Sequence, residues 1–475
     1  MAKDMSYDAV NTRRAEIMKK AVGMDYDQYE YEDGNLSFNY DKMMDDAGYS
    51  LKEIEEIEAI TGVGHTPLIE LKNLSKLSRY YAPKGKGARI FIKDEYANPS
   101  SSFKARRAAI ACYHAKKMGY KGVIAATSGN YGAAVASQAA KLGLKCIVVQ
   151  ECYDSRGVGQ PEIIEKARAC EAYGAEVLQL SVGPELFYTF LILLEETGFF
   201  NASLYSTYAI KGVETLGYEI AEECRQKYGK APEAVVVTNA GGGNLTGTAR
   251  GLLEAGAKDT QVIGASVDLS GLHMASDTQF NKKSFTTGHT GFGIPYSTWP
   301  DRSDVPRSAA RPLRYLDRYV LTTQGSVFYI TELLAKIEGI ERGPAGNTSL
   351  ACAFKLAQEF DEDAIIVVQE TEYTGAGKHI NPQLTFAIDN GIKLSVGETK
   401  NEVPGESIIL PKDPSYVHVW DNDVVEMRKS LIRNAVKNHD VKKVTKRDIE
   451  FLVEDTKSNT EFVVGYLAEL GVEHN

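Results

Sequence analysis

Short apolar runs rich in β-branched residues alternate with amphipathic helical segments from residue 61 to about residue 395, and this alternation constrains the fold most. Several runs are continuously apolar, as expected for strands buried on both faces of a parallel sheet. The runs are residues 90–93, 123–126, 146–150, 177–180, 234–238, 262–267 and 364–369. The helical segments between them include residues 131–142, 161–173, 211–228 and 348–360. The pattern predicts a multilayer α/β architecture.

The texture of the sequence divides the chain into four segments. Residues 1–60 are acidic and Tyr-rich, with helices expected at 7–22 and 51–60. Residues 61–225 and 226–396 carry the α/β pattern, and residues 397–475 form an appended segment with helices expected at 446–455 and 461–470. We expect the first and last segments to make subunit contacts rather than to take part in catalysis.

Charge, hydropathy and cysteine usage exclude several classes of function. The net charge of -10 argues against a nucleic-acid partner. The longest strongly apolar stretch, residues 186–194, is too short to cross a bilayer, and the charged amino end lacks the apolar core of a signal peptide. Six scattered cysteines form no CxxC pair and no metal-spaced cluster, which is typical of buried thiols in a reducing compartment. We therefore expect a cytoplasmic protein without a metal site or a membrane partner.

A loop of small hydroxyl residues leads to Lys104 at the start of an expected helix, in the segment 98–104 (NPSSSFK). The positive end of a helix and an apolar cleft both lower the pKa of an ammonium group. A partly neutral lysine can form a Schiff base with an aldehyde, as pyridoxal-phosphate enzymes require. A lone lysine at a helix start is usually just solvated, so this interpretation depends on the loops that follow.

Three further loops each follow an expected strand, where open parallel sheets bind their ligands. The loop 127–132 (TSGNYG) offers backbone N–H groups and small hydroxyls suited to a carboxylate. The loop 239–244 (NAGGGN) brings three adjacent glycines close to a ligand and suits a phosphate; it matches neither the Walker A nor the GxGxxG pattern. The loop 373–378 (YTGAGK) holds Thr374, whose hydroxyl could meet a pyridine nitrogen. Taken singly, the first and last of these loops could equally be ordinary turns.

Together and in this order, the four loops resemble the tryptophan-synthase β family of pyridoxal-phosphate enzymes (fold type II), which includes threonine synthase and cysteine synthase. The resemblance covers residues 61–395 and includes the segments 64–68 (GHTPL), 174–177 (GAEV) and 212–215 (GVET), together with Lys166. It implies two open, mostly parallel sheets flanked by helices, with helical extensions at both ends of this chain. In this family the cofactor is pyridoxal 5'-phosphate.

The resemblance also implies roles for individual residues. Lys104 would be the catalytic Schiff-base lysine, and Thr374 would face the pyridine nitrogen. Asn130 would meet the 3-hydroxyl of the cofactor. The remaining assignments are a phosphate site at Gly241, Gly242, Gly243 and Asn244, and a substrate-carboxylate site at Thr127, Ser128, Gly129 and Asn130.

Within the family, the segments 98–107 (NPSSSFKARR) and 127–132, the acidic leader and the tail resemble the β subunits of pyridoxal-phosphate-dependent thiolases of ornithine degradation. That resemblance implies a small α subunit as partner, an oligomer, and cleavage of 2-amino-4-oxopentanoate with coenzyme A to acetyl-CoA and alanine. The alternatives are a β-eliminating or β-replacing lyase, such as threonine synthase, threonine dehydratase or diaminopropionate ammonia-lyase, and a cofactor-binding subunit without turnover.

Two features bear on coenzyme A. A run of five arginines could meet its phosphates, although solvated charges interleaved with aspartates are the more usual explanation of such a run. The five are Arg302, Arg307, Arg311, Arg314 and Arg318. Cys152 follows an expected strand and could act as an acyl-accepting thiol, but coenzyme A itself supplies a thiol.

Overall fold

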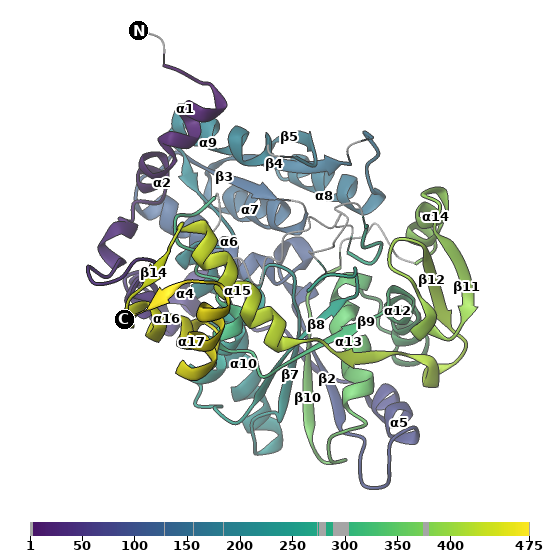
Figure 1. Cartoon of the computed structure of the whole chain (residues 1–475). Helices are drawn as coiled ribbons and strands as arrows, with labels where there is room; N and C mark the ends of the chain where they lie inside the picture. Colours follow the sequence, from purple (N-terminus) through teal and green to yellow (C-terminus); the bar gives the residue numbers. More distant parts are fainter. Residues whose placement is uncertain are drawn as a thin grey trace.

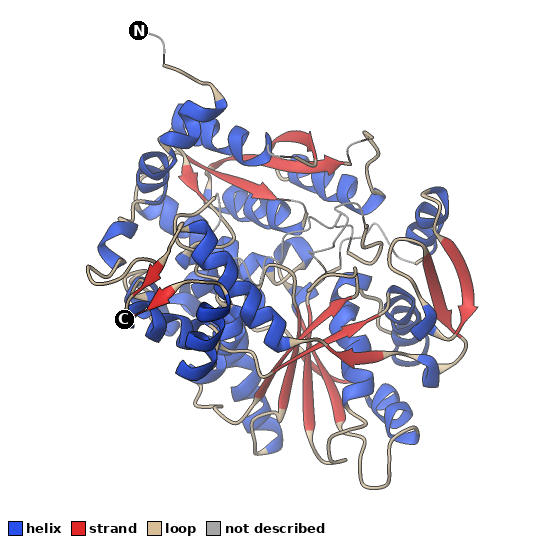
Figure 2. Cartoon of the chain, viewed as in Figure 1, coloured by secondary structure: helices blue, strands red, loops and turns tan. Residues whose placement is uncertain are grey.

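A computed structural model describes residues 3–127, 129–154, 156–183, 185–272, 274, 282–287, 304–373 and 380–474. Its described part contains two separate, mostly parallel sheets with helices on their faces, as the sequence predicts (Figures 1 and 2). Two two-stranded sheets complete the strand pairing: β11 (Lys393–Gly397) with β12 (Ser407–Pro411), and β14 (Lys443–Val444) with β15 (Glu473–His474).

The smaller sheet has four parallel strands in the order β5-β4-β3-β6. Every residue of its central strand β3 is buried, which explains the continuous apolar run in the sequence. The strands are β3 (Gly122–Thr127), β4 (Lys145–Tyr153), β5 (Glu176–Ser181) and β6 (Phe200–Asn201). The helices of this region are α6 (Lys104–Lys117), α7 (Asn130–Leu142), α8 (Pro161–Ala172) and α9 (Glu185–Thr197).

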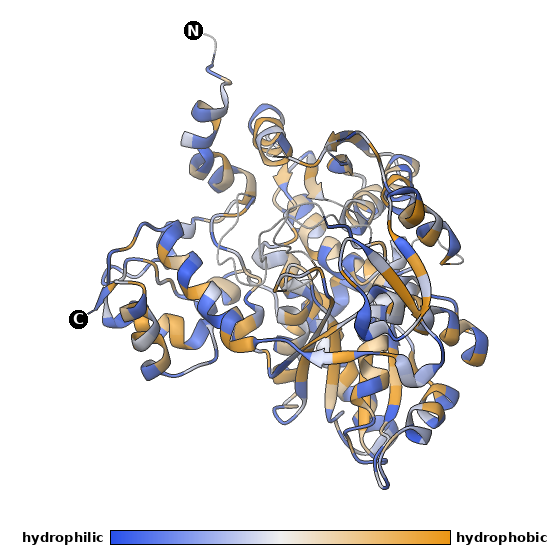
Figure 3. Cartoon of the chain, turned by 45° about the vertical axis from the view of Figure 1, so that its right-hand side comes forward, coloured by the Kyte–Doolittle hydropathy of each residue, from blue (hydrophilic) through white to orange (hydrophobic). Residues whose placement is uncertain are grey.

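The larger sheet has the order β1-β2-β10-β7-β8-β9-β13, antiparallel only at its two edge strands. Apolar residues colour much of its central strands orange in Figure 3. The strands are β1 (Leu68–Glu70), β2 (Arg89–Asp94), β7 (Ala234–Thr238), β8 (Gln261–Val267), β9 (Arg318–Thr322), β10 (Ile365–Glu370) and β13 (Val419–Asp421). The helices are α5 (Lys72–Tyr80), α10 (Thr207–Tyr228), α11 (Gly243–Glu254), α12 (Gln324–Glu338) and α13 (Pro344–Leu356).

The leader and the tail pack together although they lie at opposite ends of the sequence (Figure 1). Asp448 caps its own helix α16 and also accepts hydrogen bonds from the backbone of Leu36 and Ser37 at 3.0 Å. The leader contains α1 (Tyr7–Thr12), α2 (Arg14–Val22), α3 (Tyr40–Asp45) and α4 (Leu51–Ile60). The later elements are α14 (Asn381–Asp389), β11 (Lys393–Gly397), β12 (Ser407–Pro411), α15 (Val424–Asn438), β14 (Lys443–Val444), α16 (Lys446–Asp455), α17 (Thr460–Glu469) and β15 (Glu473–His474).

Strand pairing crosses two of the segment boundaries expected from the sequence. The strands β1 and β2 precede residue 225, yet they extend the sheet formed by β7 to β10, and β13 joins the same sheet from beyond residue 396. The division into four segments therefore stays a prediction about sequence organisation. Among the described residues, no helix combines the length and the apolar character needed to cross a membrane.

Candidate active site at the carboxyl ends of both sheets

One cavity of about 180 Å³ gathers every described residue to which the sequence assigned a site role. Its lining includes Lys104, Thr127, Gly129, Asn130, Gly241, Gly242, Gly243 and Asn244. These residues follow β2 and β7 of the large sheet and β3 of the small one, so the cavity lies where the carboxyl ends of the two sheets meet. Ser128 and Thr374 lie outside the described residues, and their assigned roles stay predictions.

Lys104 is the first residue of helix α6, as the sequence predicts. The pKa of Lys104 is lowered from 10.5 to about 7, mainly by burial and in part by the positive charges of Arg107 and Lys166. Its Nζ atom lies 4.6 Å from the centre of the Phe103 ring. A substantial fraction of this amine is therefore neutral near pH 7, the form that adds to an aldehyde.

The loop before Lys104 is held in an unusual conformation. Ser100 and Ser101 adopt positive φ angles of 61° and 56°, a region that non-glycine residues rarely occupy. The backbone of the next residues pairs with the segment after β10: Phe103 donates to the carbonyl of Thr371, and Tyr373 donates to that of Ser101, both at 3.0 Å. These bonds fix the lysine loop against the segment that leads to Thr374.

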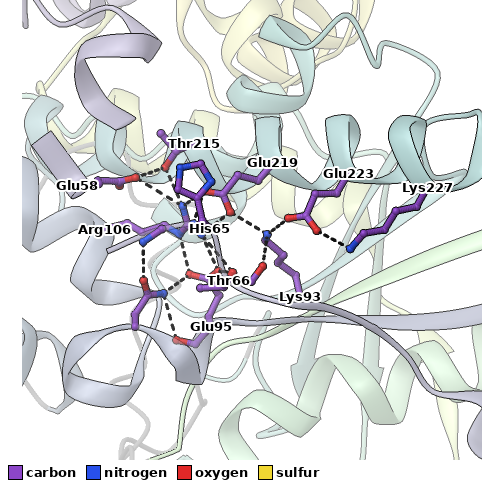
Figure 4. A network of polar contacts seen from close by, with 12 residues as sticks. Glu58, His65, Thr66, Lys93, Glu95, Arg106, Thr215, Glu219, Glu223 and Lys227 are labelled. Carbon is purple, nitrogen blue, oxygen red and sulfur yellow. Dashed lines mark hydrogen bonds and ion pairs between the residues drawn. The ribbon is translucent and has the colours of Figure 1, made fainter. Parts of the chain in front are cut away.

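A buried ion network anchors the same loop from behind (Figure 4). Arg106 is fully buried and donates bidentate hydrogen bonds to Glu95 and to Glu219, at 2.7–2.9 Å. Glu95 in turn accepts from the side-chain amide of Asn98 at 2.8 Å, at the start of the lysine loop. Glu58 from leader helix α4 lies 3.6 Å from Arg106, so the leader also contacts this anchor.

The glycines of the loop 239–244 are required by close packing. A Cβ atom on Gly241 would lie 1.8 Å from the hydroxyl oxygen of Tyr205, and one on Gly243 would lie 2.7 Å from Arg107. Gly242 has a φ of 81°, which favours glycine, and no side chain caps the N-terminus of α11 that follows it. The first N–H groups of α11 are therefore available at the cavity, as a phosphate site requires.

The loop after β3 offers a second uncapped helix start. Helix α7 begins at Asn130 without a capping side chain. The hydroxyl of Thr127 accepts from the backbone N–H of Gly129 at 3.0 Å, and both residues line the cavity. Such a helix start suits a carboxylate.

Sequence reasoning gave no role to several charged residues of the cavity. Glu372 accepts from the amide of Asn130 at 3.1 Å, and burial raises the pKa of Glu372. Lys166, which belongs to the family resemblance, forms a buried ion pair with Glu162 at 2.7 Å. Arg107 also lines the cavity. Besides Lys166, a signal existed for Arg107, which lies three residues after Lys104 and so on the same face of a helix.

The residues of the cavity fit pyridoxal phosphate. Buried polar atoms without a partner among the described residues include both amide atoms of Asn244 and the Nε of Arg107. A glycine cradle, an uncapped helix and an amine with a pKa of about 7 supply the contacts that a phosphate and an aldehyde need.

The model of the pyridoxal-phosphate dependent enzyme family matches residues 59–372. This chain belongs to that family. The chain is also 68% identical over 470 residues to a 2-amino-4-ketopentanoate thiolase beta subunit of Acetoanaerobium sticklandii, covering 99% of this chain and 100% of the relative. A threonine synthase of a Bacillus species is 27% identical over 298 residues, covering 62% of this chain and 77% of the relative.

Solved structures share the fold at low sequence identity. A serine racemase of Dictyostelium discoideum superposes with a TM-score of 0.52 at 19% identity, covering 68% of this chain and 97% of its own. An O-ureido-L-serine synthase superposes with a TM-score of 0.51 at 20% identity, covering 67% of this chain and 92% of its own. The fold-type-II architecture is therefore confirmed, and the cofactor of the family is pyridoxal phosphate.

The described members of the arginine run each pair with a carboxylate. Their contact with coenzyme A stays a prediction. The pairs are Arg307 with Glu30 at 2.6 Å, Arg311 with Asp455 at 3.1 Å, Arg314 with Glu454 at 2.9 Å, and Arg318 with Glu359 at 2.6 Å and Asp421 at 2.5 Å. All four pair with a carboxylate of the leader or of the appended segment 397–475, and such partners lie far away in the sequence. Arg302 lies outside the described residues.

Proposed function

We propose that this chain is the catalytic β subunit of a 2-amino-4-ketopentanoate (2-amino-4-oxopentanoate) thiolase. The reaction would cleave this amino keto acid with coenzyme A to acetyl-CoA and alanine. The sulfur of coenzyme A bonds to the carbonyl carbon C4, the C3–C4 bond breaks, and C3 takes up a proton to become the methyl group of alanine.

Full-length similarity carries this proposal. The match to the thiolase β subunit spans 99% of this chain, whereas the family model covers only residues 59–372 and the Bacillus threonine synthase match covers 62%. The leader and the tail are therefore shared with the thiolase subunits and lie outside the common catalytic region. Their ion pairs with the core, such as Arg311 with Asp455, make them an integral part of the fold.

We assign each part of the cofactor and the substrate carboxylate to different residues of the cavity. Lys104 would bind the aldehyde carbon of the cofactor, and the backbone from Gly241 to Asn244 would hold its phosphate. Asn130 would donate to the 3-hydroxyl, and Thr374 would face the ring nitrogen. The loop 127–130 would hold the substrate carboxylate, with its backbone N–H groups at the start of α7.

Bound pyridoxal phosphate would supply an electron sink for negative charge that develops on the substrate carbons. The amine of Lys104 would take the proton from Cα and return a proton to the alanine fragment, a task matched by its pKa of about 7. Cys152 is unsuited to carry the acetyl group, because burial raises the pKa of its thiol to about 11 and it does not line the cavity. The thiol of coenzyme A is the remaining acceptor.

A β subunit implies a partner, and we propose a small α subunit within a hetero-oligomer. The leader and tail are the segments we expect to contact it. All six cysteines are buried and unpaired, which supports a reducing, cytoplasmic location.

The direct test is product formation by the purified chain with and without a co-expressed small subunit. With 2-amino-4-oxopentanoate and coenzyme A, we expect acetyl-CoA and alanine in equal amounts. Lys104→Ala should abolish turnover together with the absorbance of the bound cofactor. The matched control is Lys121→Ala, which changes an exposed lysine beyond the far end of α6. Borohydride reduction and peptide mapping should place the pyridoxyl group on Lys104.

Two results would contradict the proposal. Release of ammonia or phosphate from a hydroxy or phospho amino acid without consumption of coenzyme A would assign the chain to the eliminating lyases. Normal turnover by Lys104→Ala would remove this lysine from catalysis.

A further inference from the structure

Arg107 is a buried cation without a carboxylate partner in the described part of the chain. Its side chain is 3% exposed, its only hydrogen bond is a 3.3 Å contact from Nη1 to the carbonyl of Leu204, and its Nε has no partner. The other buried arginines, Arg106, Arg307 and Arg311, all pair with carboxylates. A buried charge is costly unless an anion compensates it.

The guanidinium group lies against the start of the glycine loop's helix. Its Nη2 is 2.7 Å from the position that a Cβ on Gly243 would occupy, and Gly243 is the first residue of α11. Arg107 and Gly243 line the same cavity, into which the uncapped N-terminus of α11 opens. A charged donor and free backbone N–H groups therefore converge on one place.

We propose that Arg107 binds the phosphate group of the cofactor, alongside the backbone N–H groups of the glycine loop. This inference rests on the proposed cofactor site and adds to it a charged ligand that sequence reasoning missed. The planar guanidinium can donate two parallel hydrogen bonds to phosphate oxygens. Lys104 and Arg107 lie three residues apart on one face of α6, so a single helical turn would bind the cofactor at its aldehyde and at its phosphate.

The charge balance favours phosphate over the substrate carboxylate as the anion at Arg107. A phosphate monoester carries close to two negative charges at neutral pH, and the glycine loop supplies only dipoles. The carboxylate loop 127–130 instead has Lys166 beside it: a Cβ on Gly129 would lie 3.4 Å from Nζ of Lys166. Lys166 is already paired with Glu162, whereas Arg107 has no carboxylate partner among the described residues, which favours Arg107 as the ligand of the dianion. Although burial lowers the pKa of Arg107 to about 10, the group stays charged at neutral pH.

The test compares cofactor binding with and without the phosphate, and it needs no turnover. Apo-protein is titrated with pyridoxal phosphate and with pyridoxal, and absorbance of the bound species reports both affinities. Arg107→Gln should weaken pyridoxal phosphate about 10- to 100-fold, as expected for charge-assisted hydrogen bonds, and pyridoxal less than about 3-fold. Arg107→Lys keeps the charge but not the two parallel N–H donors, so its affinity for pyridoxal phosphate should lie between those of the wild type and Arg107→Gln. Arg250→Gln on the same helix α11, whose arginine pairs with Glu214, should change neither affinity more than about 3-fold.

A second experiment uses the wild-type apo-protein, so its result does not depend on whether a variant folds. Phenylglyoxal labelling of Arg107, read by peptide mass, should be reduced by pyridoxal phosphate and by inorganic phosphate but not by pyridoxal. Equal losses of both vitamers in Arg107→Gln, unchanged binding of both, or labelling that the phosphate does not alter would overturn the assignment. Failure of wild-type protein to bind either vitamer would overturn the cofactor site itself. Absence of acetyl-CoA formation with normal vitamer discrimination would contradict only the thiolase proposal.

Discussion

Replacing Lys104 with methionine should stabilise the apo-protein, and the gain should depend on pH. Without the cofactor, Lys104 is a buried amine next to two other cations, Arg107 and Lys166. Holding a proton there is unfavourable in the folded chain and normal in the unfolded chain. Methionine has a similar length and no charge, so it removes this penalty and leaves the packing nearly unchanged.

The size of the effect follows from the pKa of Lys104. Its ordinary pKa of 10.5 and its folded value of about 7 differ by about 3.5 pH units, and each unit is worth about 1.36 kcal/mol. Above pH 10.5 the amine is neutral in both states, and there is no penalty. Between pH 10.5 and 7 only the unfolded chain binds the proton, so stability falls as the pH falls. Below pH 7 the penalty is complete, at about 5 kcal/mol.

The assay is urea unfolding of both apo-proteins at pH 9, 8 and 7. The stability advantage of Lys104→Met should grow by about 2 kcal/mol from pH 9 to pH 7 and by less than about 0.5 kcal/mol more down to pH 6. The exposed control Lys121→Met should shift the curves equally at every pH. A gap between the Lys104 variant and wild type that does not change with pH would refute the argument that this amine is neutral in the folded protein.

Three other substitutions test the packing and charges around the site. Gly242→Ala should cost about 2–4 kcal/mol of unfolding free energy, because its Cβ would lie 2.4 Å from a proline ring; Gly256→Ala, also at positive φ but with open space, should cost about 1 kcal/mol. Burial raises the pKa of Glu58 well above 4.5, so the stability of the wild-type protein should fall as the pH rises from 4.5 toward that pKa. Glu58→Gln should not show this fall. If the stabilities of the two proteins change with pH in the same way, the expectation is contradicted. Asp455→Asn should cost about 3 kcal/mol, since a buried guanidinium loses its carboxylate, and a loss below about 1 kcal/mol in a thermal or urea melt would show that the pair is dispensable.

Much of the fold and the site could be predicted because the signals are local. Strand β7 and helices α4 and α16 have the bounds that the sequence indicated, since caps or turn residues delimit each apolar pattern. The lysine, asparagine and glycine loops follow strands, and strands of parallel sheets end at a common edge. The common edge of the strands and the family resemblance together predict that these three loops line one cavity.

The parts that could not be predicted depend on partners far apart in the sequence. Nothing local shows that β2 pairs with β10, or that Arg311 meets Asp455, 144 residues later. The arginine run therefore resembled either a phosphate site or solvated charge, because the carboxylates that its described members meet could not be read from the run itself. Glu372 gave no signal because its partner Asn130 lies 242 residues away.

The two adjacent arginines of α6 explain how one helix can serve structure and chemistry together. Successive helical residues point about 100° apart, so Arg106 and Arg107 face different surroundings. Arg106 enters a network in which it and Lys93 meet the carboxylates Glu95, Glu219 and Glu223, so its charge is balanced there. Arg107 faces the cavity with Lys104, where the described residues give it no anion. Because, among the described residues, the charge of Arg106 is already paired and that of Arg107 is not, only the Arg107 side of α6 offers a dianionic phosphate an uncompensated cation.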